Sequence, residues 1–272
     1  MYTNRNQSVY IFIFFCYIKI VGGYYMRILA MGGGENGRPG KPYEIKKFDE
    51  EIVKMTGKHN PTFLFIAFTQ KSVEGAENYY NVICNNFTNL GCKCEHLREK
   101  DLQDMNIVNK KITEANIIYV GGGNTLRLMN ILRKYHIDEM LRSVGEKGTI
   151  LCGISAGAIC WHNFGNSDSR RFTSNSTQLI RVTGLGFISA LFCPHYDVEN
   201  ARQEDLKRMM KTTKGVALAF ENCTALKIVD NAYWVLKTKE DARAWKCYWS
   251  NGKYIKIELP TTGKVDDLIL KN

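Results

Sequence analysis

The chain has 272 residues, and its 37 Lys and Arg against 27 Asp and Glu give a formal net charge of +10 at pH 7. Hydrophobic residues make up 44% and charged residues 24%, which excludes a disordered chain, a collagen-like repeat and a polytopic membrane protein. The basic residues are spread along the chain, without a long run of Lys and Arg. We therefore expect a solvated basic surface and no nucleic-acid partner.

Cysteine usage indicates the compartment. Nine cysteines are present, and none of them forms the C-x-x-C pair that is typical of a zinc site. Several lie inside apolar runs, where cysteine acts as a small buried hydrophobe. We expect reduced thiols in a cytoplasmic protein that needs no metal and no organic cofactor.

The first 25 residues differ from the rest of the chain. Residues 9–18 form an apolar run that is too short to span a bilayer, and Lys19 interrupts it. Met26 begins a sequence that is typical of a first buried strand. We therefore assign residues 1–25 to an N-terminal extension outside the fold, expect no stable membrane insertion, and predict one domain over residues 26–272.

From Met26 onward, short apolar runs alternate with amphipathic stretches. The runs predict buried strands, and the stretches, whose apolar residues recur at helical spacing, predict helices. The expected strands are residues 27–31, 62–68, 116–120 and 149–152, and the expected helices are residues 43–56, 73–90 and 126–141. This alternation predicts an α/β fold with a mostly parallel sheet that is flanked by helices.

Past Gly184 the pattern changes to short strands. They are expected at residues 187–193, 216–220, 225–229, 233–236, 245–249 and 254–259, and one helix at residues 199–210 interrupts them. The chain has no internal repeat and no low-complexity linker. We therefore expect additional antiparallel strands in the C-terminal part of the same domain.

Two glycine-rich turns follow predicted strands. Residues 32–37 match the G-x-G-x-x-G pattern of dinucleotide-binding loops, but a stretch with two prolines follows in place of a helix. The next strand also ends without the acid that would hold a ribose, which disfavours a nucleotide site. Gly121, Gly122 and Gly123 form the second turn, whose backbone can approach a ligand closely. A loop that only needs positive φ is the alternative.

The most informative pattern is Gly153-Ile154-Ser155-Ala156-Gly157. It follows the expected strand 149–152 and precedes a helical run, which is the strand–turn–helix context of a nucleophile elbow. The start of the helix behind the serine directs amide groups and a partial positive charge at a forming oxyanion. Ser155 is therefore the predicted nucleophile.

A nucleophilic serine needs a general base, and the chain has five histidines. His195 follows the apolar run 187–193 at a strand edge, where side chains can converge. His162 follows Ser155 on the same predicted helix, about 10 Å along its axis, and would point away from the elbow. We therefore expect His195 to be the base.

Three acids are candidates for orienting the imidazole of His195. Asp168 is the only acid between Ser155 and His195, and it fits the chain order of an α/β-hydrolase. Asp197 follows the histidine by two residues, as in a class I glutamine amidotransferase. Glu221 ends the expected strand 216–220. The residues themselves leave this choice open.

Four segments occur in a characteristic order: Gly122-Gly123-Asn124-Thr125, Gly153-Ile154-Ser155-Ala156-Gly157-Ala158, Pro194-His195-Tyr196-Asp197 and Ala219-Phe220-Glu221-Asn222. Together they resemble the peptidase E (aspartyl dipeptidase) and cyanophycinase family of serine peptidases, from Met26 to about Val235. The resemblance implies a parallel sheet flanked by helices, related to the class I glutamine amidotransferase fold. It also implies a Ser-His-Glu triad of Ser155, His195 and Glu221.

The same resemblance implies the surroundings of the triad and the activity. The oxyanion would be bound by the amides of Ala156 and of the turn at Gly122 and Gly123, with Asn124 near the substrate. The expected function is a cytoplasmic serine peptidase that hydrolyses short peptides through an acyl-enzyme, as a dipeptidase that prefers an N-terminal acidic residue. The alternatives are another acyl-transfer hydrolase, such as an esterase or amidase, and a non-catalytic ligand-binding protein.

A substrate contact is expected beyond the elbow helix. Arg170 and Arg171 follow a predicted polar loop at residues 163–169. One of them would form a forked pair with a substrate carboxylate, and two solvated surface arginines are the alternative. The expected partners are therefore a small peptide substrate and, as one option, a second copy of the chain in a homodimer.

Overall fold

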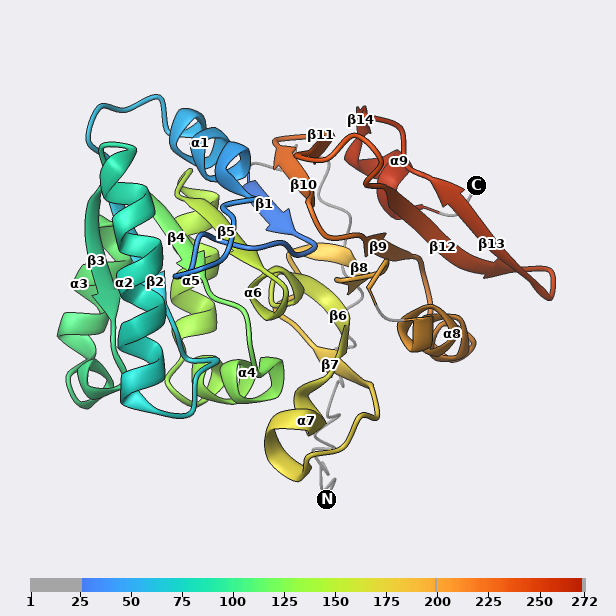
Figure 1. The fold of residues 1–272 in the computed structure, drawn as a ribbon, viewed down its shortest axis with the longest axis horizontal. Coiled ribbons are helices and arrows are strands. Elements are labelled where there is room, and N and C mark those ends of the chain that lie inside the picture. Colours follow the sequence, from blue (N-terminus) through green and yellow to red (C-terminus); the bar gives the residue numbers. More distant parts are fainter. Residues whose placement is uncertain (1–25, 199, 271–272) are drawn as a thin grey trace, which may run out of the picture.

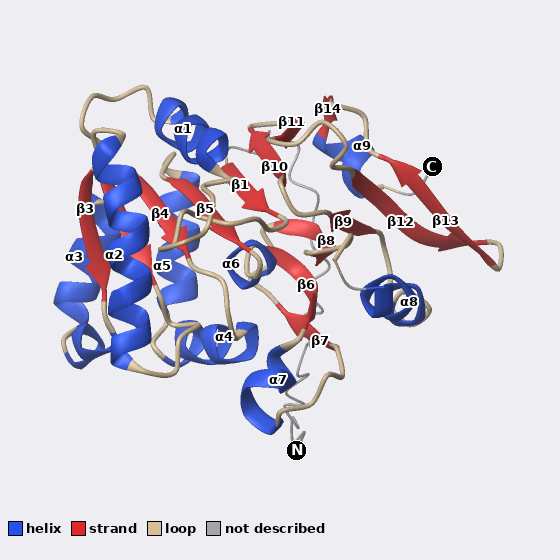
Figure 2. Cartoon of the chain, viewed as in Figure 1, coloured by secondary structure: helices blue, strands red, loops and turns tan. Residues whose placement is uncertain are grey.

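The computed structural model describes residues 26–198 and 200–270 (Figure 1). Two mixed sheets with helices around them make up this part of the chain (Figure 2). The expected α/β class with sheets flanked by helices is therefore confirmed. The expected extension at residues 1–25 lies outside the described residues, and the single-domain organisation stays a prediction.

The first sheet has eight strands, in the order β14-β11-β10-β1-β5-β4-β2-β3. Five of them run parallel: β1 (Arg27–Met31), β5 (Ile150–Ile154), β4 (Ile117–Val120), β2 (Thr62–Ile66) and β3 (Lys93–Leu97). Three antiparallel strands extend the sheet beyond β1: β10 (Thr224–Val229), β11 (Ala232–Lys237) and β14 (Thr262–Lys264). The carboxyl ends of β1 and β5 lie side by side, because Met31 pairs with Ile154.

Four helices cover the two faces of this sheet: α1 (Lys46–Met55), α2 (Val73–Asn89), α3 (Met105–Glu114) and α5 (Ile137–Glu146). A fifth helix, α4 (Thr125–Lys134), packs against α5 and α6 (Ala156–Ile159). Phe63 of β2 belongs to a buried cluster with Phe87 of α2, whereas the next residue, Leu64, belongs to a cluster with Leu141 of α5. Successive side chains of a strand point to opposite faces. Accordingly, α1 and α2 lie in front of the strands in Figure 1, and α3 and α5 lie behind them.

The second sheet has six strands, in the order β13-β12-β9-β8-β6-β7. They are β6 (His162–Ser167), β7 (Ile180–Thr183), β8 (Ile188–Cys193), β9 (Ala217–Phe220), β12 (Ala244–Ser250) and β13 (Lys253–Glu258). One buried cluster includes Val120 of β4, Phe192 of β8 and Phe220 of β9, so the two sheets share a core.

The remaining helices are η1 (Glu99–Gln103), a 3₁₀-helix, and the α-helices α6 (Ala156–Ile159), α7 (Ser169–Ser174), α8 (Asn200–Met209) and α9 (Val265–Ile269). α6 and α7 follow the strands β5 and β6, so they lie close to the carboxyl edge of the sheets. Of the helices in the described residues, none is long and apolar enough to cross a membrane.

The strands expected past Gly184 are confirmed within one residue at each end. Their expected antiparallel arrangement is confirmed only in part. β10 pairs antiparallel with β11, and β12 pairs antiparallel with β13. In contrast, β8 runs parallel to both β6 and β9. The parallel centre of the second sheet was not expected, because β6 is too polar to be recognised as a strand.

The expected loop at residues 163–169 and the expected helical position of His162 are therefore wrong. α6 ends at Ile159, and His162 begins β6. The polar side chains of this strand are buried against distant partners: the guanidinium of Arg202 donates to the side-chain oxygen of Asn166, and the hydroxyl of Ser167 donates to that of Thr125. Such long-range partners leave no local signal, so the strand resembles a loop in the sequence.

The expected single helix at residues 126–141 is also wrong, because two helices, α4 and α5, share this segment. His136 separates them, and its φ of 54° lies in the left-handed region that ends a regular helix. Leu132 and Ile137, on either side of the break, are both buried. The apolar spacing therefore continues across the break, so the sequence pattern predicts one continuous helix.

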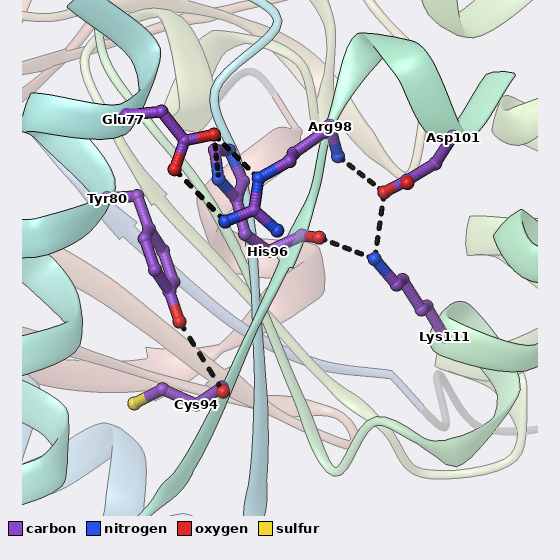
Figure 3. A network of polar contacts seen from close by, with 7 residues as sticks. All are labelled: Glu77, Tyr80, Cys94, His96, Arg98, Asp101 and Lys111. Atoms are coloured by element: carbon purple, nitrogen blue, oxygen red, sulfur yellow. Dashed lines mark hydrogen bonds and ion pairs between the residues drawn. The ribbon is translucent and has the colours of Figure 1, made fainter. Parts of the chain in front are cut away.

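The edge strand β3 is held to α2 by a polar network (Figure 3). His96 is 2% exposed, and its ring stacks on Tyr80 with 4.7 Å between the ring centroids. Its Nδ1 lies 3.5 Å from the carboxylate of Glu77, which also accepts a hydrogen bond of 2.6 Å from Arg98. Burial lowers the pKa of His96 to about 4, and the positive charge of Arg98 acts in the same direction. The imidazole is therefore neutral at pH 7.

Candidate active site

Ser155 lies in the sharp turn between β5 and α6. Its φ of 54° and ψ of −110° are strained for a residue with a side chain. Two glycines permit the turn: a Cβ atom on Gly153 would lie 2.6 Å from the carbonyl oxygen of Gly157, and one on Gly157 would lie 1.9 Å from that of Val120. The predicted strand–turn–helix context of the Gly-x-Ser-x-Gly pattern is therefore confirmed.

The imidazole of His195 lies beside Ser155. His195 follows β8 through Pro194, and its amide donates a hydrogen bond of 3.0 Å to the carbonyl oxygen of Gly32. This bond ties the end of a strand of the second sheet to the loop after β1 in the first sheet. The Nε2 atom of His195 is 2.9 Å from the Oγ atom of Ser155. The two residues are thus placed as a base and a nucleophile need to be.

His162, the other histidine near the elbow in sequence, is part of the core. It is fully buried, its Nδ1 lies 2.9 Å from the carbonyl oxygen of Ala158, and its ring stacks on Phe192. Burial lowers its pKa to about 3. His162 is therefore a neutral structural residue at pH 7.

The other ring nitrogen of His195 faces Asn222. The Oδ1 atom of Asn222 lies 2.7 Å from Nδ1. Asn222 stands in the turn between β9 and β10, where the chain passes from the second sheet to the first. With an acceptor at Nδ1, the ring carries its proton there, and the lone pair of Nε2 faces the serine hydroxyl. This is the tautomer that a general base requires.

Two of the candidate acids lie near this pair and bind other groups. Both carboxylate oxygens of Glu221 accept hydrogen bonds, one of 2.8 Å from the amide of Arg243 and one of 3.1 Å from the indole nitrogen of Trp245. A carboxylate oxygen of Asp197 accepts a bond of 2.8 Å from the backbone amide of Asn222. Both acids therefore support the turn that carries Asn222.

The first glycine loop lies directly against the pair of His195 and Asn222. A Cβ atom on Gly33 would lie 1.9 Å from the Oδ1 of Asn222 and 2.4 Å from the Nδ1 of His195. The carbonyl oxygen of Gly33 also accepts a hydrogen bond of 3.0 Å from the amide of Cys223. The loop therefore needs glycine because two side chains approach its backbone, which accounts for the pattern that resembled a dinucleotide fingerprint.

The second glycine loop is fixed by three side chains. The amide of Gly122 donates to the phenol oxygen of Tyr79 at 3.0 Å. Its carbonyl oxygen accepts bonds of 2.7 Å from the hydroxyl of Thr69 and 3.0 Å from the side-chain amide of Gln70. Burial raises the pKa of Tyr79 to about 12, so the phenol stays protonated at neutral pH. Both polar groups of Gly122 are therefore occupied by the protein.

The amides of Gly123 and Ala156 are the available donors of the predicted oxyanion site. Neither has a protein acceptor within the part of the chain that the structure describes. Gly122 and Gly123 share one planar trans peptide, so fixing the carbonyl of Gly122 also fixes the direction of the Gly123 amide. Asn124 does not reach the cleft: it is 6% exposed, and its side chain caps α4 by accepting from the amide of Arg127.

Ser155, His195 and Asn222 open into a cleft of about 620 Å³. Both glycine loops, α2 and the start of α7 contribute to its lining, with Arg38, Tyr79, Val82, Asp168 and Phe172 among the side chains. A volume in this range is typical of sites for small molecules. The nucleophile therefore lies in a cleft of the size that a short peptide requires.

Most charges in the cleft are paired. The carboxylate of Glu44 lies 2.6 Å from Lys239, whose hydrogen bond is the main cause of the lowered pKa of Glu44. Arg38 lies 2.8 Å from Glu35. Asp168 also lines the cleft and, among the described residues, has no ion-pair partner. The cleft therefore offers one unpaired carboxylate to a ligand.

The two arginines expected to contact the substrate lie elsewhere. Arg170 and Arg171 are exposed on α7 and are not part of the cleft lining, and Arg170 donates to the side chain of Gln178. From the same helix, Phe172 does line the cleft. Within the described residues, no group of three or more His, Cys, Asp or Glu side chains is arranged to hold a metal ion.

Residues 28–235 match the family model of peptidase family S51. The chain belongs to this family. It is 29% identical over 243 residues to the uncharacterized peptidase YgaJ of Bacillus subtilis (strain 168), a match that covers 86% of this chain and 97% of the relative. It is 25% identical over 108 residues to Peptidase E of Shewanella denitrificans, which covers 40% of this chain and 43% of the relative.

A solved structure has the same fold. The crystal structure of a peptidase from an acI-B1 actinobacterium matches with a TM-score of 0.65 and 18% identity, over 86% of this chain and 97% of that one. The expected resemblance to the peptidase E family is confirmed, and the S51 chain is a peptidase. Membership of the family supports a serine peptidase.

Sequence reasoning missed two residues of this site. Asn222 directly follows Glu221 in the motif 219–222, but only acids were considered as partners of the histidine. Neighbouring residues in a turn after a strand point in different directions, which could have brought Asn222 into consideration. Tyr79 reaches Gly122 from 43 positions away in the chain, so no local signal marks it.

Proposed function

We propose that the S51 chain is a serine peptidase that hydrolyses short peptides through an acyl-enzyme on Ser155. The observation that carries this proposal is the 2.9 Å contact between the Oγ of Ser155 and the Nε2 of His195, at a strained turn that opens into the cleft. A structural serine has no need of strained backbone or of an imidazole held in the tautomer of a base.

The reaction follows from this geometry. His195 accepts the hydroxyl proton at Nε2 as the Oγ of Ser155 attacks the peptide carbonyl. The imidazolium then donates that proton to the leaving amine, and the acyl group remains on the serine. Water attacks the ester in the second step, with His195 again acting as the base. No metal or organic cofactor takes part.

The oxyanion of each tetrahedral intermediate binds the amides of Gly123 and Ala156. These two donors flank the nucleophile, because Ala156 follows Ser155 and a Cβ atom on Gly122 would lie 3.5 Å from the Cβ of Ser155. Donors that are already oriented stabilise the developing negative charge without reorganisation. This assignment keeps the two loops expected for the oxyanion site. Of the two glycines expected in the second loop, only Gly123 serves as a donor, because the amide of Gly122 donates to Tyr79.

Dipeptidase activity is supported by the charge and size of the cleft. Asp168 offers its unpaired carboxylate to the α-ammonium group of a substrate. A free N-terminus is the feature that separates a dipeptide from an internal peptide segment. We therefore assign Asp168 to substrate binding rather than to the orientation of His195.

Preference for an N-terminal acidic residue needs a cation in the cleft, and Arg38 supplies one. Its ion pair with Glu35 is exposed, and exposed pairs contribute little free energy. A substrate carboxylate can therefore replace Glu35 as the partner of the guanidinium, in a forked pair.

The proposal extends to the fold classification, the cellular location, the oligomeric state and the domain organisation of the enzyme. The nucleophile follows the parallel strand β5 at the carboxyl edge of the sheet, which supports an amidotransferase-like classification of the fold. All described cysteines are free thiols, which supports a cytoplasmic location. A homodimer and a single domain over residues 26–272 complete the proposal.

Labelling with a serine-directed phosphonate, combined with a dipeptide panel, tests the proposed function. We expect one phosphonate per chain on Ser155, and a kcat/KM for Asp-Leu at least about 10-fold above that for Leu-Leu. Equal values for the two dipeptides would contradict the acidic preference. Labelling with ester hydrolysis but no peptide cleavage would favour an esterase, and an unlabelled chain without turnover would favour a ligand-binding protein.

The Arg38→Gln variant tests whether Arg38 causes the preference for an N-terminal acidic residue. We expect it to lower kcat/KM for Asp-Leu toward the Leu-Leu value and to leave Leu-Leu cleavage unchanged. Arg171→Gln should behave as wild type, because Arg171 is not part of the cleft lining. Loss of the preference in Arg171→Gln but not in Arg38→Gln would contradict the role of Arg38.

A further inference from the structure

We infer that Asn222 is the positioning residue that holds His195 ready for catalysis. This inference rests on the proposed function, because it assigns a role within the same site. Two contacts support the inference, and both involve the imidazole of His195. Asn222 Oδ1 is 2.7 Å from His195 Nδ1, and His195 Nε2 is 2.9 Å from Ser155 Oγ. Both contacts have the length of a true hydrogen bond.

The turn that carries Asn222 is held by several neighbours. Asp197 accepts a hydrogen bond from the amide of Asn222, and the amide of Cys223 donates to the carbonyl of Gly33. Cys223 has a φ of 63°, so the chain reverses sharply at this point. A Cβ atom on Gly33 would overlap Asn222, so this glycine leaves the space that the side chain occupies. The amide oxygen is thereby fixed at the imidazole.

Glu221 has a different and equally specific setting. Its two carboxylate oxygens anchor the turn to the start of β12, through the amide of Arg243 and the indole of Trp245. Its carbonyl oxygen accepts a 2.6 Å bond from the hydroxyl of Thr224. Reaching the imidazole would require the carboxylate to leave both donors. We therefore assign Glu221 to the support of Asn222.

An amide oxygen can do part of what a carboxylate does. It accepts the Nδ1 proton of His195, which fixes the ring orientation and leaves Nε2 free to take the proton of Ser155. It carries no charge, so it stabilises the imidazolium less than a carboxylate would. Papain-like proteases use an asparagine in this way behind their catalytic histidine. Asn222 would therefore act on the base by fixing its orientation.

Kinetics of Asn222 variants test the inference. In Asn222→Ala we expect kcat to fall at least about 100-fold with KM changed less than about threefold, because only the orientation of the base is lost. Asn222→Asp keeps an acceptor of the same shape and should recover most of the lost kcat. Its carboxylate favours the imidazolium, so the acid limb of its pH–rate profile should move to higher pH than in wild type.

Two control variants separate Asn222 from its neighbours. Asn109→Ala, on the exposed side of α3, should leave kcat and KM unchanged. Glu221→Gln keeps the shape of the side chain, and we expect its kcat to stay within about 10-fold of wild type. A larger loss of kcat in Glu221→Gln than in Asn222→Ala would overturn the inference, as would wild-type kcat in Asn222→Ala.

A measurement that does not depend on turnover keeps this inference distinct from the proposed function. Nitrogen NMR of histidine-labelled protein reports which ring nitrogen of His195 carries the proton. We expect the Nδ1–H tautomer in wild type and a mixture of tautomers in Asn222→Ala. An unchanged tautomer in the variant would overturn the role of Asn222, even in a chain that cleaves peptides. Failure of wild type to react with the phosphonate would overturn the proposed function alone.

Discussion

The hydroxyl of Thr69 donates a hydrogen bond of 2.7 Å to the carbonyl oxygen of Gly122. Thr69 lies just beyond the end of β2 and is 2% exposed. Gly122 lies beyond the end of β4, the neighbouring strand, so the contact joins two loops at one edge of the sheet. The bond fixes the peptide plane whose other end is the amide of Gly123. A core residue thereby orients a donor of the proposed oxyanion site.

Removal of this bond should slow catalysis without weakening substrate binding. In Thr69→Val, which keeps the shape of the side chain, we expect kcat to fall about 10-fold with little change in KM. Gln70 still holds the same carbonyl oxygen, which limits the loss. Steady-state kinetics with the best dipeptide measures the effect, and Thr113→Val on the surface of α3 is the control. An increase in KM at unchanged kcat would show that the loop binds the ground state instead.

Ser155→Ala should abolish turnover and leave the fold intact. The substitution removes one oxygen atom at a half-buried position, so it changes packing little. We expect kcat to fall by at least about 10⁴-fold, since the nucleophile is lost and only the oxyanion site remains. Phosphonate labelling and the thermal unfolding midpoint are measured in parallel. Ser143→Ala, at an exposed position of α5, should retain both labelling and activity, and residual turnover in Ser155→Ala would contradict the mechanism.

Ser155 and His195 could be predicted because their signals are local. The elbow needs small residues within five positions, and the histidine directly follows an apolar strand, so both are visible in short stretches of sequence. Their separation of 40 positions in the chain did not matter, because the ends of strands in α/β sheets meet at one edge.

The partner of His195 and the strand β6 could not be predicted in the same way. Which residue of the pair Glu221 and Asn222 faces the imidazole depends on Arg243 and Trp245, whose donors hold the carboxylate. The polar residues of β6 depend on burial against Arg202. In both cases the deciding partners come from other elements, and no pattern in the local sequence encodes them.

Gly157→Ala should destabilise the fold severely. A Cβ atom at this position would lie 1.9 Å from the carbonyl oxygen of Val120, a backbone atom of a buried strand that cannot move aside. We expect the free energy of unfolding to fall by more than about 4 kcal/mol, or the protein not to fold. Chemical denaturation measures the change.

The control is Gly148→Ala, where a Cβ atom meets nothing within 4 Å. Only the strain of a φ of 96° remains there, which costs about 1–2 kcal/mol. An equal loss of unfolding free energy in the two variants would contradict the importance of the close approach between Gly157 and the carbonyl oxygen of Val120.

His96 should make the fold sensitive to acid. Its pKa is about 4 in the folded protein, mainly because of burial, against an ordinary value of 6.5. Between these values the unfolded chain binds a proton that the folded chain does not, so the free energy of unfolding falls as the pH drops through this range. The contribution is present above about pH 6.5 and is lost progressively toward about pH 4, at most about 3 kcal/mol.

A variant isolates this contribution from the other buried groups. Burial raises the pKa of Asp49 to about 7, which makes the folded state less stable as the pH rises, so the total stability does not report His96 alone. His96→Phe keeps a ring that can stack on Tyr80 and removes the titration. As the pH falls from about 7 to about 4, we therefore expect the free energy of unfolding of wild type to fall more than that of His96→Phe. Urea denaturation at a series of pH values measures this difference, and a difference that does not vary with pH would contradict the depressed pKa.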